Sequence, residues 1–414
     1  MGKEIEYSAQ ARTNPVYLTG KTAVCLMADA GITDADKIVD KLRLNTGELG
    51  MPDPEMMLGN ELVVEAKYRT MCRLIENTGI QTNVDLPCGY TPKAVHMSEK
   101  GLCFVGLDLP IVAQEVEPVI LSLAAHPELI RIQGADATNL ESLRSALNGI
   151  SGPLCISTEG MMMYFTETEA SSVISNIRSL LEEFGGCWIT PDPEFMMQFF
   201  LTFQSVLGQH ALQKLKASRD KATGQSDVVN LTNSFIVNVA DIQGTSNAAL
   251  ALLQKHGLKA ERINLAANMP ELCAYRKLTP EQISAFKEAM AKCHYWKITL
   301  DAARKPKAEK QDARPFGMDY TVKDNSFIVS LRGRMDTITA PELLKAWEEE
   351  KTAHNIQGFE IDCTQLQYVS SAGLRVLLMM YKSLADKSRF KLLNVSDEVK
   401  EILEVTGFDQ FLLT

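Results

Sequence analysis

Short apolar runs alternate with stretches of helical spacing along most of the first 300 residues. Five of the runs follow one another closely and predict strands, at 82–86, 102–107, 129–133, 153–157 and 187–190. Two further runs, at 260–265 and 295–300, bring the predicted strands to seven. Strands that alternate with helices at this spacing are joined by right-handed crossovers, so the sequence predicts an α/β fold with a Rossmann-like, mainly parallel sheet.

Two segments interrupt this alternation and divide the chain. Residues 1–80 have apolar positions at helical spacing and predict a helical cap on the sheet domain, which as a whole spans 1–300. Residues 301–317 hold two prolines, eight charged residues and almost no large apolar ones, which is typical of a linker. Residues 318–414 predict a hairpin followed by alternating helices and strands, and hence a second, smaller α/β domain.

The charge balance narrows the classes of partner. The 414 residues include 52 acidic and 42 basic ones, a net charge of −10 that argues against nucleic acid or an anionic membrane surface. Residues 1–6 contain no apolar leader, and no run approaches the roughly 18 apolar residues that span a bilayer. The nine cysteines form no C-x-x-C pair, so we expect free thiols in a reducing compartment. We therefore expect a cytoplasmic protein without a metal site.

The stretch 82–93 combines a strand, a tight turn and the start of a helix. Val84 and Leu86 flank Asp85 at the end of the strand, and Gly89 allows the backbone to approach a ligand closely. Thr91 and Pro92 then predict an N-cap followed by proline at the first helical position. A carboxylate beside a helix N-terminus at the carboxyl edge of a parallel sheet is where open α/β folds bind nucleotides.

Acidic residues also follow the next three predicted strands. Asp85, Asp108, Asp136 and Glu159 stand at or just past the ends of successive strands. Each acid alone is more often a cap for the following helix, but a parallel sheet brings all four to one edge. Asp108 lies 23 residues beyond Asp85, where an acid can accept the ribose hydroxyls of a nucleoside, and Asp136 can then face the base.

Residues 1–300 resemble class I S-adenosylmethionine-dependent methyltransferases of the leucine carboxyl methyltransferase and polyketide O-methyltransferase family. The resemblance rests on four segments, 84–94, 106–108, 136–137 and 159–165. It implies S-adenosylmethionine in the crevice beside Asp85, with its methionine end near Gly89, its ribose on Asp108 and its base near Asp136 and Ala137. It also implies that Glu159 and Tyr164 border the transferred methyl group and that Arg69 of the cap binds the cofactor carboxylate.

Two readings of this domain follow from the resemblance. In the first, the domain is an O-methyltransferase acting on a small molecule or a carboxylate, and alignment of the acceptor oxygen and exclusion of water supply most of the rate. In the second, it is a non-catalytic signalling adaptor, because Pro87 replaces the family's first glycine and removes a backbone donor. NAD is disfavoured as a ligand because G-x-G-x-x-G is absent.

Residues 318–414 resemble the STAS (sulfate transporter and anti-sigma factor antagonist) domain, a small regulatory module. The resemblance rests on the run 361–364 and on 368–378, which includes Ser370, Ser371 and Gly373. It implies a protein partner such as a kinase or an anti-sigma-like factor, and it implies that Ser371 is the phosphorylated serine. A helix N-terminus favours a phosphate, but a plain N-cap serine explains the same residue equally well.

Overall fold

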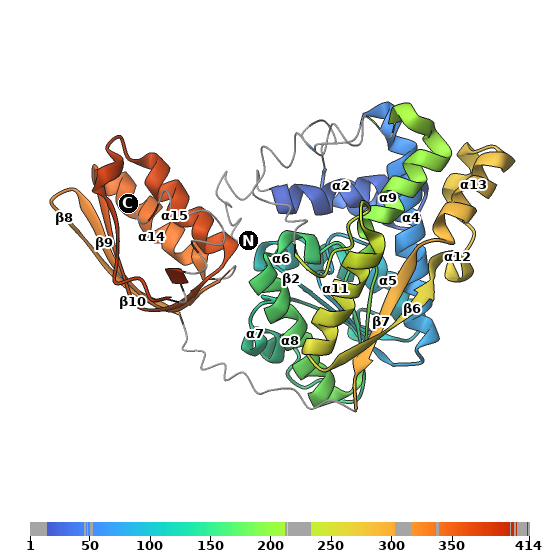
Figure 1. Cartoon of the computed structure of the whole chain (residues 1–414), viewed down its shortest axis with the longest axis horizontal. Coiled ribbons are helices and arrows are strands. Elements are labelled where there is room, and N and C mark those ends of the chain that lie inside the picture. The colour runs from blue at the N-terminus through green and yellow to red at the C-terminus, as the bar shows by residue number, and fades with distance from the viewer. Residues whose placement is uncertain are drawn as a thin grey trace. The chain divides into compact units, whose positions relative to one another are not determined.

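Figure 1 shows a computed structural model of the whole chain. The structure describes residues 15–44, 47, 49, 53–211, 213, 233–302, 316–336, 339–397, 399–400, 403 and 412. The chain divides into two compact units, Met1–Pro306 and Lys307–Thr414. Most of the predicted linker 301–317 and the first part of the predicted cap lie outside the described residues.

The N-terminal unit is built on a seven-stranded sheet with the order β3-β2-β1-β4-β5-β7-β6. Only β7 runs antiparallel to its neighbours β5 and β6, while the other pairs are parallel. This confirms the predicted Rossmann-like, mainly parallel sheet. The strands are β1 (Thr82–Asp85), β2 (Cys103–Asp108), β3 (Ile130–Gly134), β4 (Leu154–Ser157), β5 (Gly186–Thr190), β6 (Leu258–Asn264) and β7 (His294–Leu300).

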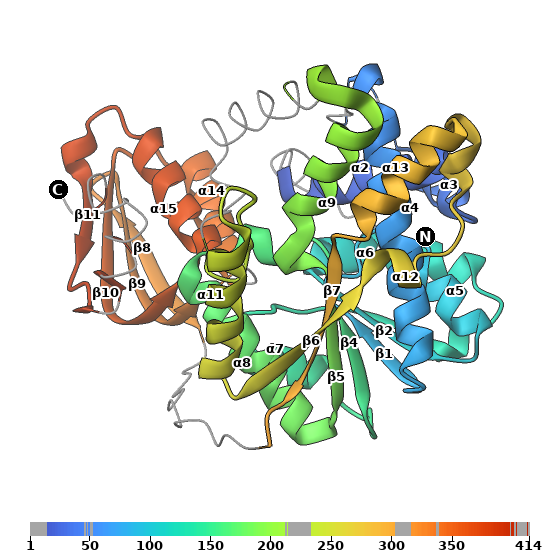
Figure 2. The same ribbon diagram turned by 45° about the vertical axis from the view of Figure 1, so that its right-hand side comes forward.

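Helices cover both faces of this sheet (Figure 2). One face is packed by helices of the amino-terminal and late parts of the unit, whose apolar residues form one core: α2 (Pro15–Ala30), α3 (Ala35–Lys41), α4 (Pro54–Asn77), α5 (Lys93–Glu99), α6 (Pro110–Leu123), α12 (Leu265–Asn268) and α13 (Pro280–Met290). A second core forms on the other face, beneath α7 (Leu140–Ala146), α8 (Glu167–Phe184) and α11 (Ile242–Lys255).

An insertion after β5 carries the chain away from the sheet edge. The short turn η3 (Asp192–Glu194) leads into α9 (Phe195–Thr202) and then a π-helical turn, η4 (Phe203–Leu207). The side chain of Lys67 on α4 reaches Phe195, whereas a side chain at Gly59 would collide with Phe203. Helices α4 and α9 therefore pack antiparallel, with their mutual interface beginning at the carboxyl edge of the sheet.

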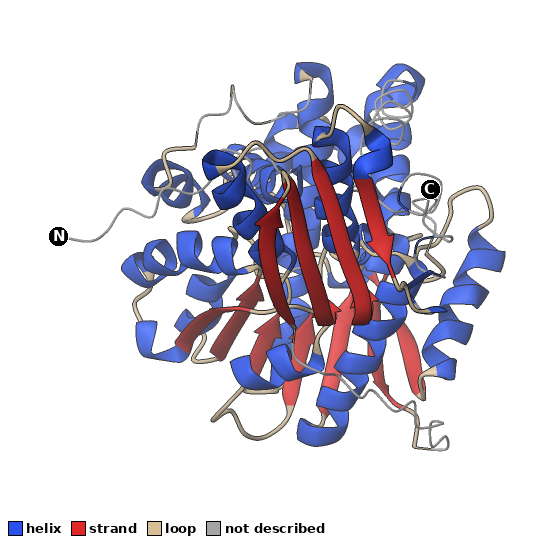
Figure 3. Cartoon of the chain, turned by 90° about the vertical axis from the view of Figure 1, so that its left-hand side faces the viewer, coloured by secondary structure: helices blue, strands red, loops and turns tan. Residues whose placement is uncertain are grey.

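The C-terminal unit is a four-stranded sheet, order β11-β10-β9-β8, in which only the pair β8–β9 is antiparallel. Its strands are β8 (Gly317–Lys323), β9 (Ser326–Met335), β10 (Gly358–Val369) and β11 (Phe390–Leu393). Helices α14 (Ala340–Ala353) and α15 (Ser371–Ser383) pack on one face around Phe327, Trp347 and Phe359, and Figure 3 shows the other face. This confirms the predicted smaller α/β fold.

Two local features of the N-terminal unit differ from what the sequence predicted. Helix α5 begins at Lys93 with Pro92 as its N-cap, so the prediction of Thr91 as the N-cap was wrong. Helix α13 was not predicted, although Thr279 and Gln282 form a capping box at its start.

The cysteines are free thiols, and seven of the nine are buried. Among the described helices, none combines the length and apolar character of a membrane span.

Candidate functional site

The acids predicted to meet at one sheet edge do end neighbouring strands there. Asp85 is the last residue of β1 and Asp108 the last of β2. Asp136 follows β3 by two residues and Glu159 follows β4 by two residues. Because β1, β2, β3 and β4 are parallel neighbours, their carboxyl ends lie side by side.

Asp108 holds the turn that follows β1 in place. Its Oδ2 accepts a hydrogen bond from the Gly89 amide at 2.7 Å, and its Oδ1 accepts one from the Leu109 amide at 2.8 Å. Gly89 has φ of 55°, a conformation that glycine adopts without strain. Burial raises the pKa of Asp108 to about 6, although both amide hydrogen bonds act to lower it. The sequence prediction that Gly89 and Asp108 lie together therefore describes a direct contact.

Asp136 and Ala137 form the third part of this edge. Asp136 Oδ1 accepts hydrogen bonds from the amide and the hydroxyl of Thr138, both at 2.8 Å. The Ala137 carbonyl accepts a hydrogen bond from Asn176 of α8 at 2.9 Å. Both residues are almost fully buried, so their contacts brace the turn after β3 beside Asp108.

Asp85 belongs to a buried ion pair that sequence reasoning missed. Lys93 Nζ lies 2.9 Å from Asp85 Oδ1, and the side chains are 4% and 1% exposed. Ser157 donates to the same oxygen at 2.6 Å, whereas Asp85 Oδ2 has no hydrogen-bond partner among the described residues. Burial disfavours a charged lysine, but Asp85 and Glu159 outweigh it and raise the pKa of Lys93. Burial raises the pKa of Asp85, against the opposing effect of Lys93.

Glu159 meets the helical cap at the edge above β4. Its Oε1 lies 3.5 Å from Nζ of Lys67, which is on α4. The backbone after Glu159 is held by Asp192, whose carboxylate accepts amide hydrogen bonds from Gly160, Met161 and Met162 at 2.6 to 3.0 Å. Asp192 is 1% exposed, and so it fixes the segment that positions Glu159.

Tyr164 lies in the same segment and contacts the cap through its ring hydroxyl. Burial raises the pKa of Tyr164, and a hydrogen bond with Thr19 of α2 partly offsets that effect. Helix α2 also reaches the glycine turn, where Lys21 forms a 2.9 Å ion pair with Glu115 of α6 and lies over the ring of Tyr90. The amino-terminal helix thus contacts both the Gly89 turn and the Glu159 segment.

Arg69, which the resemblance assigns to the cofactor carboxylate, pairs with a carboxylate of its own helix. Its Nε donates to Glu65 Oε1 at 2.6 Å, and its Nη2 lies 3.0 Å from the sulfur of Cys273. Glu65 is fully buried and also accepts the amides of Cys273 and Ala274 at 2.7 and 2.9 Å. These contacts dock α4 onto the turn η5 (Cys273–Lys277) and engage Nε and Nη2 of the guanidinium. Among the cap residues at the edge, Lys67 rather than Arg69 reaches Glu159.

A hollow of about 330 Å³ adjoins the Asp108 end of the edge. It lies between the first turns of α6, at Pro110, and the end of β3, at Gly134. This hollow does not include Glu159 or Tyr164. On the other side of the edge, Lys67 lies between Glu159 and the ring of Phe195 on α9.

In the C-terminal unit, α15 begins directly after β10. Ser370 is the N-cap, and its hydroxyl accepts the Gly373 amide at 3.3 Å. Ser371 is the first residue of α15, so the capping role suggested for it belongs to its neighbour; its side chain lies outside the described part of the chain. A Cβ on Gly373 would lie 2.8 Å from Val369 Cγ2 and 3.0 Å from the Met335 carbonyl oxygen, so glycine permits this close packing.

Comparison with known proteins identifies the C-terminal unit. Residues 318–414 match the family described as "Mlab, STAS domain". Over 85 residues the chain is 31% identical to the anti-sigma-B factor antagonist of Listeria monocytogenes, covering 20% of this chain and 74% of that protein. A solved anti-sigma factor antagonist from Mycobacterium paratuberculosis is 23% identical, with 23% of this chain and 81% of that chain covered and a TM-score of 0.21.

The larger unit also has solved structural neighbours. One is magnesium protoporphyrin IX methyltransferase from Synechocystis PCC 6803 with bound SAH, which is 11% identical to this chain. The match covers 56% of this chain and 89% of that chain, with a TM-score of 0.35.

Proposed function

The C-terminal unit belongs to the STAS domain family, and we propose that the N-terminal unit of the same chain is an S-adenosylmethionine-dependent O-methyltransferase. Its acceptor is a small molecule or a carboxylate, and the STAS domain tethers or regulates it through a protein partner. The observation that carries the proposal is the direct contact between Gly89 and Asp108 at the carboxyl edge of a parallel sheet.

The residues at this edge offer hydrogen-bond acceptors for the hydroxyl and amino groups of the cofactor. Each carboxylate oxygen of Asp108 accepts one backbone amide and retains a lone pair, so that the pair can accept the two ribose hydroxyls. Asp136 and Ala137, which follow β3, would border the base. Asp85 Oδ2, which has no partner among the described residues, is an acceptor for the cofactor's amino group near Gly89.

The protein's own contribution is alignment and exclusion of water. S-adenosylmethionine, when bound, supplies a methyl group already activated by its sulfonium. Glu159 and Tyr164 would border the acceptor, and Asp192 holds their segment rigid through three amide hydrogen bonds. Helix α2 closes against the Gly89 turn and Tyr164, which keeps solvent from the reacting atoms.

Replacing Asp108 by alanine is expected to weaken binding of S-adenosylmethionine by about 1.5–3 kcal/mol, since hydrogen bonds to a charged acceptor are lost. Isothermal titration calorimetry of the full chain measures this directly. Glu128→Ala, at an exposed acid outside the edge, is the matched control and should bind as the wild type does. Absence of binding to the wild type, or equal binding to Asp108→Ala, would contradict the proposed cofactor.

Cofactor affinity should also fall in mild acid. The pKa of Asp108 is raised to about 6 by burial, so its carboxylate is ionised at neutral pH and gains a proton as the pH falls below that value. The protonated form is a weaker acceptor for ribose hydroxyls, and so the dissociation constant for S-adenosylhomocysteine should rise roughly tenfold between about pH 8 and about pH 5. In Asp108→Asn this dependence should disappear. A wild-type affinity that is flat across the range would argue against Asp108 as the ribose acceptor.

One observation favours the adaptor reading as the second candidate. Lys93 and Asp85 neutralise each other at the centre of the edge, and Pro87 in the adjoining turn has no amide to donate. A chain that binds neither S-adenosylmethionine nor its demethylated product would then act only through its STAS domain. Phosphorylation at Ser371, and a kinase or an anti-sigma-like factor as the partner, stay predictions under either reading.

A further inference from the structure

Two cysteines lie side by side on neighbouring strands of the larger sheet. Strands β4 and β5 are parallel, and their register pairs Cys155 with Cys187. Side chains at paired positions point to the same face of a sheet, and both residues belong to the core that α4 covers. Among the strand pairs of the described chain, no other sets one cysteine against another.

The spacing of these strands suits a bond between the two sulfurs. The residues just before the cysteines, Leu154 and Gly186, are also paired, and a Cβ on Gly186 would collide with the Leu154 backbone. Glycine therefore lets β5 begin close against β4. Neighbouring strands lie about 4.7–4.9 Å apart, and disulfides join cysteines whose Cα atoms are roughly 4.4–6.8 Å apart.

The two thiols also interact in the reduced protein. A hydrogen bond from Cys155 lowers the pKa of Cys187 against the opposing effect of burial, and Lys297 of β7 acts in the same direction as the hydrogen bond. The same hydrogen bond, together with burial, raises the pKa of Cys155. Since the thiolate is the form that attacks an oxidant, Cys187 is suited to react first and Cys155 to form the second bond.

Other buried cysteines have no such activation. Burial raises the pKa of four of them, Cys72, Cys88, Cys293 and Cys363. A buried thiol in apolar surroundings is chemically inert, because little of it is ionised at neutral pH. These four thiols are therefore an internal reference for the reactivity of the pair.

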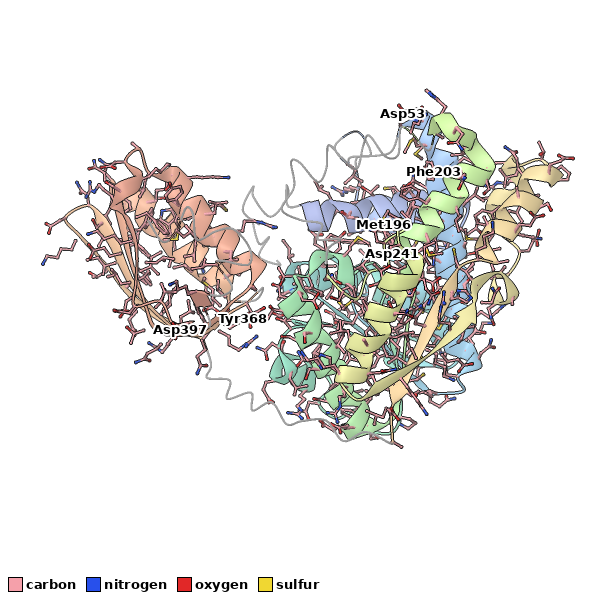
Figure 4. All side chains as sticks on the ribbon, viewed as in Figure 1. Asp53, Met196, Phe203, Asp241, Tyr368 and Asp397 are labelled. Carbon is pink, nitrogen blue, oxygen red and sulfur yellow. The ribbon has the colours of Figure 1, made fainter. Side chains whose placement is uncertain are left out.

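The pair lies near the end of the sheet opposite the carboxyl edge. Cys187 follows the exposed Gly186, while the Thr78 hydroxyl, just past the end of α4, interacts with Cys155 and precedes the exposed Gly79. Side chains fill the space between α4 and the sheet (Figure 4), so a large oxidant is excluded. A molecule as small as hydrogen peroxide can reach the sulfurs when the last turn of α4 opens locally.

We propose that Cys155 and Cys187 are a redox-responsive pair that a hydroperoxide converts into a disulfide and a dithiol reductant restores. This inference is independent of the methyltransferase function. With hydrogen peroxide, the Cys187 thiolate attacks one oxygen, the O–O bond breaks, and the departing hydroxide takes up the proton that the thiol released. The Cys155 sulfur then attacks the sulfenic sulfur of Cys187, and its proton leaves with the oxygen as water. The two sulfurs lose two electrons in all, and one peroxide becomes two water molecules.

The test treats the folded full chain with hydrogen peroxide, blocks the remaining thiols with iodoacetamide, and maps the peptides by mass spectrometry. We expect one linked pair of peptides, carrying Cys155 and Cys187, that is lost on reduction with dithiothreitol. The pair should react at least about tenfold faster than Cys363, since more of Cys187 is ionised. Cys155→Ala and Cys187→Ala should each abolish the link. Cys363→Ala, at a buried thiol of the smaller unit, is the matched control and should keep it.

The peptide map of the wild type decides the question even where an alanine variant does not fold. Circular dichroism before and after the treatment checks that the chain stays folded, and electrophoresis without reductant separates links within one chain from links between chains. The proposal is overturned if peroxide oxidises Cys363 before any link forms. It is equally overturned by a link that joins other cysteines or separate chains, or by one that forms only in urea.

Discussion

Replacing Lys93 by methionine is expected to lower the free energy of unfolding of the N-terminal unit by about 3–5 kcal/mol, because it strands a buried carboxylate. Asp85 is 1% exposed, and Lys93 Nζ at 2.9 Å is the cation that compensates its charge. Methionine has a similar length and fills the space, so the loss reflects charge rather than a cavity. Urea unfolding followed by circular dichroism measures the change.

A double variant separates the contribution of the ion pair to stability from the contributions of its two side chains. Asp85→Asn combined with Lys93→Met removes both charges but keeps an acceptor for Ser157, which now donates to Asp85 at 2.6 Å. This double variant should recover at least half of the stability lost in Lys93→Met. Lys255→Met, at an exposed position, should change stability by about 0.5 kcal/mol or less. If Lys93→Met costs no more than that control, the ion pair is not a stabilising contact of the native state.

Local patterns in the sequence predicted the sheet and the acidic residues at its carboxyl edge. Runs such as 102–107 and 187–190 are apolar, short and bounded by turn residues, and these properties do not depend on distant parts of the chain. Once the strands were placed, the parallel order brought Asp85, Asp108 and Asp136 to one edge without further information. Gly89 lies in the turn after β1 at the same edge, and the structure adds that its amide donates to Asp108.

The roles of the basic residues depended on tertiary packing and could not be predicted in the same way. Lys67, Arg69 and Arg73 lie on one helix, and the sequence does not indicate which of them the fold buries. In the folded chain Lys67 lies beside Glu159, and Arg69 forms an ion pair with Glu65. One usable signal existed, since Glu65 and Arg69 have the i, i+4 spacing of a helical ion pair.

Helix α13 was missed for a different reason. Its capping box, in which Thr279 and Gln282 bond each other's backbone amides, is a local feature readable from the sequence. Its apolar residues Ile283, Phe286 and Met290 also recur at helical spacing, so the segment carries both local signals of a helix. This helix packs against the insertion after β5, where Gln282 donates to the Val206 carbonyl of η4.

Replacing Glu194 by alanine is the second change with a large expected effect, about 3–5 kcal/mol of lost stability. Glu194 is fully buried, and its Oε1 accepts hydrogen bonds from Arg262 at 2.7 Å and from the indole of Trp296 at 3.0 Å. Its Oε2 accepts the amide of His294 at 2.8 Å. Alanine would leave the buried indole and amide donors without an acceptor and Arg262 without its counter-ion, and each of these losses adds to the cost.

Glu194 also connects the start of α9 to the strands β6 and β7. It immediately precedes α9, which bears Phe195 and Gln198, and its partners Trp296 and Arg262 lie on β7 and β6. Glu182→Ala removes an exposed helical ion pair with Arg178 and is the control, with an expected cost of about 0.2–1 kcal/mol. If Glu194→Ala unfolds at the same urea concentration as Glu182→Ala, the buried carboxylate does not anchor α9. If stability falls as expected, Glu194 holds the start of α9 against β6 and β7.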